Sequence, residues 1–388
     1  MDRKNRFGRP SFLAVDLDRL AQNVHLVKKQ LGKGVELMAV VKAFGYGHGA
    51  LPVAKVALAS GATSLGVAFV EEGIALRQAG IQAATVVLYP DFSERAALFA
   101  RYDLIPTIID EKFGRAYVKS SKELRRKKTS FALKVETGLN RYGISAHEAL
   151  RLAKSLLRHK GAELWELSSH LATAGEEDME FARWQVQRLK EARVLFERVG
   201  IYPRYVSLAN SGAVLDLPES YFNLARVGVL LFGYPSRTAA GGSLPARPIM
   251  TLESRIAQLK TLRPGETVSY GREFGAPDKR LVATLPLGFS DGYPRHLGNK
   301  GWVLVREVRA AVVGRIAMDA MMVDVTQVPG VRAGDRVVLM GEMGKEKITA
   351  EDLAGWLGTS AYEIITRMGA RLPIEYTGKM ARKLGFSK

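Results

Sequence analysis

Across about the first 230 residues, short apolar segments alternate with longer amphipathic ones. The short segments are rich in β-branched residues, as strands are, and the longer ones show helical spacing between glycine, proline or capping residues. Eight strand-then-helix repeats predict an α/β fold, a (β/α)8 barrel of the TIM type rather than an open doubly wound sheet. The expected strands are 36–43, 64–69, 84–89, 104–109, 130–136, 164–170, 204–209 and 222–227, and the expected helices include 51–59, 71–78, 145–158 and 177–199.

The pattern changes near residue 245, where helical spacing largely disappears. Short strands separated by turn residues follow, which predicts a mostly β second domain with two late helices. The segment AGGSLPA, 240–246, suggests the boundary, so we expect domains at 1–243 and 244–388, with a first strand near 11–16 that could join the β domain. The strands expected there are 255–262, 280–287, 301–305, 310–313 and 336–339, and the helices are 350–357 and 362–368.

The composition fits a globular protein with a large core. The 388 residues are 47% hydrophobic and 25% charged. The absence of cysteine excludes disulfides, thiol catalysis and thiolate metal sites, and we expect no metal. We find neither a membrane-spanning apolar run nor a signal-peptide core in the sequence, so we expect a cytoplasmic protein that does not bind membranes.

The net charge of +18 raises the question of nucleic-acid binding. The densest basic run, KSSKELRRKK at 119–128, has no interleaved aromatic residues and falls where a helix is expected. A solvated helix face explains it better than a nucleic-acid-binding arm. We therefore expect the charge to attract anionic substrates or cofactors, and no nucleic-acid partner.

The segment LMAVVKAFGYGHG, 37–49, places Lys42 at the end of an apolar strand and before a glycine-rich turn. Gly45, Gly47 and Gly49 let the backbone turn sharply and approach a ligand closely. Taken alone, the segment fits a ligand-free turn equally well. However, the carboxyl ends of barrel strands meet at one mouth, where barrel enzymes carry their chemistry. The polar residues at or just beyond the expected strand ends are Lys42, Lys134, Arg141, His170, Asn210, Ser211 and Arg226.

Several long motifs extend over almost the whole chain. In order, they are AVVKAFGYGHG, LKVETGLNRYG, LANSGA, ARVGVLLFGYP, ETVSYGREF, VGRIAMDAMMVDV and SAYEIITRMGARLP. Together they resemble the motifs of alanine racemases, which interconvert L- and D-alanine with pyridoxal 5'-phosphate (PLP). The resemblance implies an isomerase that supplies D-alanine for peptidoglycan.

The resemblance implies a two-base mechanism. Lys42 would hold PLP covalently and then act as the base on one face of the substrate. A single fixed base returns the proton to the side it came from, so Tyr270 would serve the opposite face. A phenol is a weak base unless nearby cations stabilise its phenolate. Arg226 would donate to the pyridine nitrogen and, because arginine keeps its protons, would leave that nitrogen unprotonated.

The remaining roles also follow from the resemblance. His170 would lie against the ring face, and Arg141 would reach the phenolic oxygen of PLP and the substrate. Lys134, which is carbamylated in many relatives, would position Arg141; the sequence leaves its modification open. Met318 would offer its backbone N–H to the substrate carboxylate, and Asp319 would lie beside it in the substrate site. The phosphate and its loop would involve Tyr46, Asn210, Ser211, Gly228, Val229 and Tyr362.

The family also implies a homodimer with shared sites, in which the β domain of one subunit brings Tyr270 to the barrel of the other. Three positions depart from the usual family pattern, namely Ser207 for histidine, Phe289 for tyrosine and Ala317 for cysteine; they bear on entrance polarity and rate.

Three other hypotheses about the function stay open. A racemase of other or more amino acids, such as serine, fits the same architecture, although Tyr362 narrows the pocket toward a small side chain. Arg226 argues against an amino-acid decarboxylase. The second domain with Tyr270 argues against a non-catalytic PLP carrier.

Overall fold

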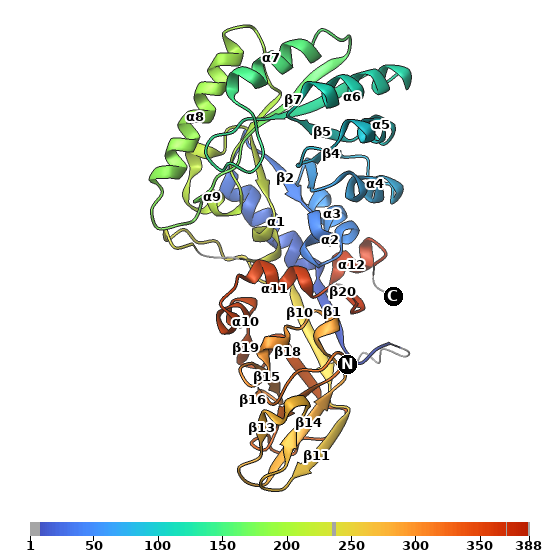
Figure 1. Ribbon diagram of the computed structural model, residues 1–388, viewed down its shortest axis with the longest axis vertical. Helices are drawn as coiled ribbons and strands as arrows, with labels where there is room; N and C mark the ends of the chain where they lie inside the picture. Colours follow the sequence, from blue (N-terminus) through green and yellow to red (C-terminus); the bar gives the residue numbers. More distant parts are fainter. Residues whose placement is uncertain (1–7, 235–237, 370, 387–388) are drawn as a thin grey trace. The chain divides into compact units, whose positions relative to one another are not determined.

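The computed structural model describes residues 8–234, 238–369 and 371–386, so the motif residues Pro235 and Ala370 lie outside it. The chain forms two compact units. The barrel unit comprises Leu20–Gly45 and Ala50–Arg247, and the β unit comprises Met1–Arg19, Tyr46–Gly49 and Pro248–Lys388 (Figure 1).

The barrel unit is built on a closed ring of eight parallel strands, β2 to β9, which confirms the expected barrel. Helices lie on the outside of the ring (Figure 1). The strands are β2 Glu36–Val40, β3 Ser64–Val67, β4 Ala84–Val87, β5 Ile105–Ile108, β6 Thr129–Lys134, β7 Ala162–Ser168, β8 Tyr205–Ser207 and β9 Leu224–Val227. The helices are α1 Leu17–Leu31, α3 Ala50–Ala59, α4 Val70–Gln78, α5 Ala96–Arg101, α6 Glu111–Glu123, α7 Ala146–Leu156, α8 Glu180–Glu197 and α9 Ser211–Asp216.

All eight expected strands are present, but seven of them end one to three residues earlier than the apolar pattern indicates. Val41, Ala68 and Ala209 show why, because each is buried although it lies beyond its strand. The loops at the carboxyl ends are themselves packed, so apolar character continues after the ladder hydrogen bonds stop.

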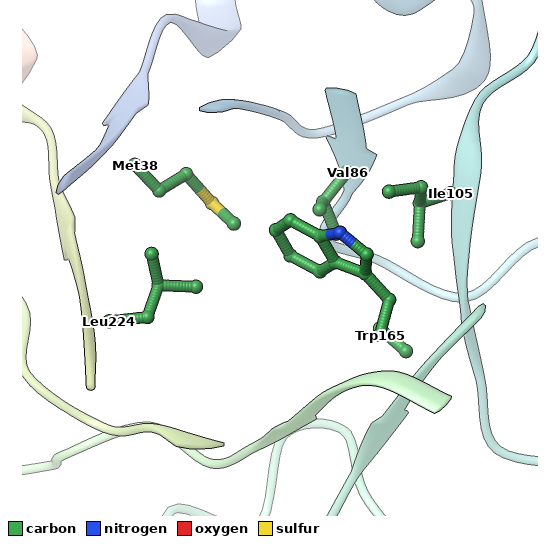
Figure 2. Packing of buried hydrophobic residues seen from close by; sticks show 6 residues of the cluster. Met38, Val86, Ile105, Trp165 and Leu224 are labelled. Carbon is green, nitrogen blue, oxygen red and sulfur yellow. The ribbon is translucent and has the colours of Figure 1, made fainter. Parts of the chain in front are cut away.

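The barrel interior holds a compact apolar cluster, shown in Figure 2. It combines Met38, Val86, Ile105, Ala132, Trp165 and Leu224, contributed by six different strands. Strand β7 carries a bulge beside this cluster: Phe131 of β6 pairs with Leu164, but the next residue, Ala132, pairs with Glu166. Trp165 is therefore an extra residue, and Glu166 takes the inward orientation of its partner Ala132.

The basic run at 119–128 is only partly a helix face. Helix α6 ends at Glu123, and the rest of the run leads through a turn into β6. Lys119 and Lys122 are exposed on the helix, as expected. Arg126, in contrast, donates to the carbonyls of Ala100 and Arg101 at 2.8 and 3.0 Å, so it ties the turn to helix α5.

The β unit contains a ten-strand sheet in the described ranges, in the order β11-β14-β17-β16-β15-β18-β10-β1-β20, with β19 paired to β18. β1, Phe12–Asp16, runs antiparallel to β10 and parallel to β20. The expected strand 255–262 is broken at Ile256, because β10 ends at Arg255 and β11 starts at Gln258. The expected late helices are confirmed as α10 and α11.

The other strands are β10 Met250–Arg255, β11 Gln258–Leu262, β12 Thr267–Val268, β13 Phe274–Gly275, β14 Arg280–Leu285, β15 Trp302–Val305, β16 Val308–Val312, β17 Met321–Asp324, β18 Arg336–Met343, β19 Glu346–Ile348 and β20 Ile374–Thr377. The helices are α10 Ala350–Leu357, α11 Ala361–Arg367 and α12 Lys379–Lys383. None of the helices in the described ranges is both long and apolar enough to cross a membrane.

Candidate active site

The strand ends bring polar side chains to the carboxyl-terminal mouth of the barrel. Lys134 is the last residue of β6, and Lys42 begins the turn α2, Lys42–Tyr46, just after β2. Arg226 on β9 pairs with Met38, whose side chain belongs to the inner cluster, so Arg226 also points inward. The barrel thus gathers cations that lie far apart in the sequence.

The turn after Lys42 has an unusual backbone. Ala43 and Phe44 have φ values of 53° and 55°, in the left-handed region that costs a non-glycine residue about 1–2 kcal/mol. The Glu72 carboxylate stabilises this turn, because it accepts hydrogen bonds from the backbone N–H groups of Ala43 at 2.6 Å, Ala68 at 2.6 Å and Phe69 at 3.2 Å. This contact fixes the chain next to Lys42.

Two glycines of the turn lie so close to other residues of the chain that a Cβ atom would not fit. A Cβ atom on Gly47 would lie 2.3 Å from the carbonyl oxygen of Ile365, and one on Gly49 would lie 1.9 Å from the hydroxyl of Tyr376. The sequence suggested that these glycines allow a ligand to approach. At Gly47 and Gly49, the close neighbours in the structure are other residues of the β unit.

Lys42 lies against Tyr89, a residue that the sequence reasoning missed. The Lys42 amine is 3.4 Å from the Tyr89 hydroxyl and 5.3 Å from the centre of its ring. The Arg141 guanidinium lies 5.6 Å from the same ring. Tyr89 therefore links two predicted site residues. Tyr89 stands at the carboxyl end of the expected strand 84–89, as the predicted polar site residues stand at or just beyond the ends of theirs. That position could have identified it as a site residue from the sequence.

Two groups in the mouth have strongly lowered pKa values. Burial lowers the pKa of Lys134 to about 7, and the charges of Arg226 and Arg141 act in the same direction. Burial, together with the charge of Arg226, holds the pKa of His170 well below its ordinary value. Near neutral pH, His170 is therefore uncharged, and Lys134 has a substantial fraction of neutral amine.

The Arg226 guanidinium is buried and held from several sides. Its Nη1 donates to Glu166 Oε1 at 3.3 Å and to the Ser207 hydroxyl, and its Nη2 donates to the Ser169 carbonyl. The side chains of Arg226 and Glu166 are 6% and 1% exposed. Glu166 was also missed by sequence reasoning, although an acidic residue within an apolar strand pattern is a signal of a buried partner.

The loops after β8 and β9 are joined by Ser211. Its hydroxyl accepts from the backbone N–H groups of Gly228 at 3.2 Å and Leu230 at 3.3 Å. The Asn210 side chain accepts from Ala213 N–H at 3.1 Å and so caps helix α9. In the described part of the chain, no residue accepts from the backbone N–H of Val229.

Two predicted site residues of the β unit, Tyr270 and Tyr362, lie in exposed positions, and Tyr46 is half-buried. Tyr270 opens a short turn after β12 and is 71% exposed, and Tyr362 on α11 is 44% exposed. Tyr46 lies at the end of the left-handed turn, where its carbonyl is 2.8 Å from Nδ1 of His48.

Met318 and Asp319 lie on one loop that a polar network fixes. The Ser290 hydroxyl donates to the Met318 carbonyl at 2.6 Å. Arg371 donates to Asp319 at 2.5 Å and to the fully buried Asp291 at 2.8 Å. The hydrogen bond from Arg371 lowers the pKa of Asp319, so this carboxylate stays ionised.

The mouth of the barrel can therefore bind an anion and present a primary amine to it. The basic side chains there are Lys42, Lys134, Arg141 and Arg226. Within the described ranges, no three His, Cys, Asp or Glu residues form a group that could hold a metal ion.

Comparison with known proteins points to one family. The family model described as "Alanine racemase, N-terminal domain" matches residues 15–236, and "Alanine racemase, C-terminal domain" matches residues 249–376. An alanine racemase from Halothermothrix orenii is 37% identical and covers 97% of this chain and 99% of its own length.

Solved structures agree with the sequence comparison. An alanine racemase structure from Clostridium difficile 630 matches with a TM-score of 0.90 at 30% identity, over 96% of this chain and 97% of its own. A histidine racemase from Leuconostoc mesenteroides matches with a TM-score of 0.85 at 26% identity, over 95% of this chain and 98% of its own. The fold is therefore shared by racemases with different substrates.

Proposed function

The chain belongs to the alanine racemase family, and from this premise we propose that it interconverts L- and D-alanine with PLP as its cofactor. The observation that carries the proposal is the position of Lys42. Its amine follows β2 on a strained turn that Glu72 fixes, at a mouth crowded with cations. An amine and surrounding cations suit a phosphorylated aldehyde.

The groups present in the mouth fit PLP. Lys42 would hold the aldehyde carbon, Arg226 would donate to the pyridine nitrogen, and Arg141 would reach the phenolic oxygen. The neutral His170 would pack against the ring without adding charge. Residues for the phosphate would be Tyr46, Ser211, Gly228, Val229 and Tyr362, with Asn210 shaping the loop through its helix cap. Among them, the Val229 N–H is a donor that no described residue uses.

When bound, PLP would supply an electron sink for the negative charge that forms at the substrate Cα. Lys42 would hold or release the proton on one side of Cα, and Tyr270 would do so on the other. Met318 would offer its backbone N–H to the substrate carboxylate, with Arg141 and Asp319 beside it. Ser290 holds the Met318 carbonyl, which orients that peptide group.

Arg226 supports racemisation over decarboxylation. A guanidinium keeps its protons near neutral pH and cannot protonate the pyridine nitrogen. The electron sink that PLP supplies would then be weaker, and return of the proton to Cα would be favoured over other reactions. A broader racemase is the second candidate, because the histidine racemase has the same fold at 26% identity.

Exposed aromatic side chains on the mouth loops support a homodimer with shared sites. Phe44, Phe69 and Phe92 are 55%, 55% and 76% exposed on loops that follow barrel strands. Phe181 and Trp184 stack on each other in the first turns of α8, with ring centres 5.3 Å apart. Large exposed apolar groups mark interaction surfaces. We propose that the partner's β unit covers them and delivers the exposed Tyr270.

The proposed role is to supply D-alanine for peptidoglycan in the cytoplasm. A strain that lacks the gene should then need added D-alanine to grow. Normal growth of that strain without D-alanine would contradict this role.

A chiral assay with purified protein and PLP tests the proposed reaction. L- and D-alanine should each be converted to the racemic mixture, with serine and histidine turned over more slowly. Lys42→Ala should lower the rate at least about a hundredfold, because a positioned acid-base group contributes roughly that much. The exposed Lys33, in the turn before β2, provides the control variant Lys33→Ala, which should retain activity. Faster turnover of histidine or serine than of alanine would replace the proposed substrate.

Mixed dimers test the shared site. Lys42→Ala and Tyr270→Phe homodimers should be nearly inactive, because every site lacks one base. After random subunit exchange at equal amounts, roughly a quarter of all sites should contain both groups, as the symmetry of a two-fold dimer requires. Mixing Lys42→Ala with the Lys42→Ala/Tyr270→Phe double variant is the control, since it creates no complete site. Verified exchange without recovered activity would rule out sharing of Tyr270.

We propose that Lys134 is carbamylated. A neutral amine reacts with carbon dioxide, and the pKa of about 7 leaves Lys134 largely neutral at pH 8. Isotopically labelled bicarbonate should give a carbamate carbon signal at pH 8 that weakens as the pH falls below 7 and is missing in Lys134→Ala. The signal in Lys128→Ala, a change at an exposed lysine, should match the wild type. Equal signals in wild type and Lys134→Ala would exclude the modification.

A further inference from the structure

Glu166 is a buried carboxylate in a part of the barrel where the neighbouring charges are mostly positive. We propose, building on the proposed function, that Glu166 is a positioning residue for Arg226: with Ser207 it fixes the guanidinium and leaves a defined pair of its N–H groups for the pyridine ring of PLP. Glu166 would act through Arg226 and would not touch the cofactor.

The bulge in β7 is what brings Glu166 into the barrel. Trp165 is the extra residue, and its ring lies in the apolar cluster (Figure 2). Without the extra residue, Glu166 would point to the opposite side, because side chains alternate along a strand. Its other neighbour, Tyr205, also packs against the inner cluster, which supports the inward orientation. Bulges commonly redirect a side chain beside an active site.

Ser207 links Glu166 to Arg226. It pairs with Ser168 of β7 and lies at the end of β8. Its hydroxyl donates to Glu166 and accepts from Arg226, so a single small side chain bridges both charged groups. This arrangement restrains the guanidinium in position and in rotation.

The contacts determine which donors remain. A guanidinium group carries five N–H bonds. Nη1 uses two of them, on Glu166 and Ser207, and Nη2 uses one, on the Ser169 carbonyl. In the part of the chain that the structure describes, Nε–H and the second Nη2–H therefore remain for a ligand. If Glu166 were absent, Nη1 would lose its ionic partner, and other orientations of the group would become accessible.

Glu166 also balances charge. Burial lowers the pKa of Arg226, and the charge of Glu166 acts against this effect. The same carboxylate opposes the lowering of the Lys134 pKa by burial, Arg226, Arg141 and Lys42. Removing the charge of Glu166 would therefore make the whole mouth more positive, and nearby groups, including bound PLP, would be harder to protonate.

The test compares Glu166→Gln with the control Glu163→Gln. Glu163 lies on the same strand, but it pairs with Lys128 at the surface at 3.3 Å. The first measurement is the pH at which the absorption of bound PLP changes in the holoenzyme. We expect Glu166→Gln to lower this midpoint by about one unit or more, as expected when a nearby opposite charge is lost, and Glu163→Gln to leave it unchanged.

The second measurement needs no PLP. In protein without cofactor, the NMR signal of the Arg226 Nε–H, assigned with Arg226→Lys, should be sharp in wild type and in Glu163→Gln. In Glu166→Gln it should broaden through motion or solvent exchange. A protein that binds no PLP would defeat the proposed function, whereas this measurement would still decide whether Glu166 holds Arg226.

Unchanged midpoint and unchanged Arg226 signal in Glu166→Gln would overturn the proposal. If Glu166→Gln does not fold, Glu166→Asp carries the test. Aspartate keeps the charge but is too short to keep the 3.3 Å contact, so the Arg226 signal should broaden while the midpoint moves less. Glu166→Asp with a wild-type Arg226 signal would equally contradict the proposal.

Discussion

Closure of eight parallel strands into a ring is the constraint on which the rest of this structure depends. It forces all strand carboxyl ends to one mouth, and so it brings Lys42, Lys134, Arg141 and Arg226 into one another's electric field. Burial at the mouth, and after it this crowding of positive charge, lowers the pKa of Lys134 to about 7. Glu166 offsets part of it from inside the barrel, and an anionic ligand would offset more.

This electrostatic arrangement connects the fold to the proposed reaction. A mouth with excess positive charge attracts a phosphorylated cofactor and a substrate carboxylate. The left-handed turn held by Glu72 presents Lys42 there, but a single base cannot invert a stereocentre. In the proposed dimer, the exposed Tyr270 of the β unit would come from the partner subunit, which would also explain the exposed aromatic residues on the mouth loops.

Sequence patterns predicted the fold closely because strand and helix periodicity reports burial. The eight strands and helices α10 and α11 are present, and the comparisons confirm the family. The alternation of apolar and polar residues could not show the bulge at Trp165. This one inserted residue turns the Glu166 side chain to the opposite side of the strand. The need for glycine at positions 47 and 49 also depends on residues that are distant in the sequence. The roles of Lys42, Tyr270 and the other site residues stay predictions.

The central claim is that the charged groups of the barrel mouth bind an anionic cofactor. The most direct test measures this binding without the covalent bond to Lys42. If Lys42 is the residue that holds PLP, as proposed, Lys42→Ala would not bind PLP covalently, and any stabilisation of this variant would report the remaining contacts. The measurement is its free energy of unfolding with PLP and with pyridoxal, which lacks the phosphate. At a PLP concentration of 100 times its Kd, we expect a gain of about 2.7 kcal/mol, and a much smaller gain with equal pyridoxal. Equal effects of the two compounds, or none from PLP, would contradict this view of the site.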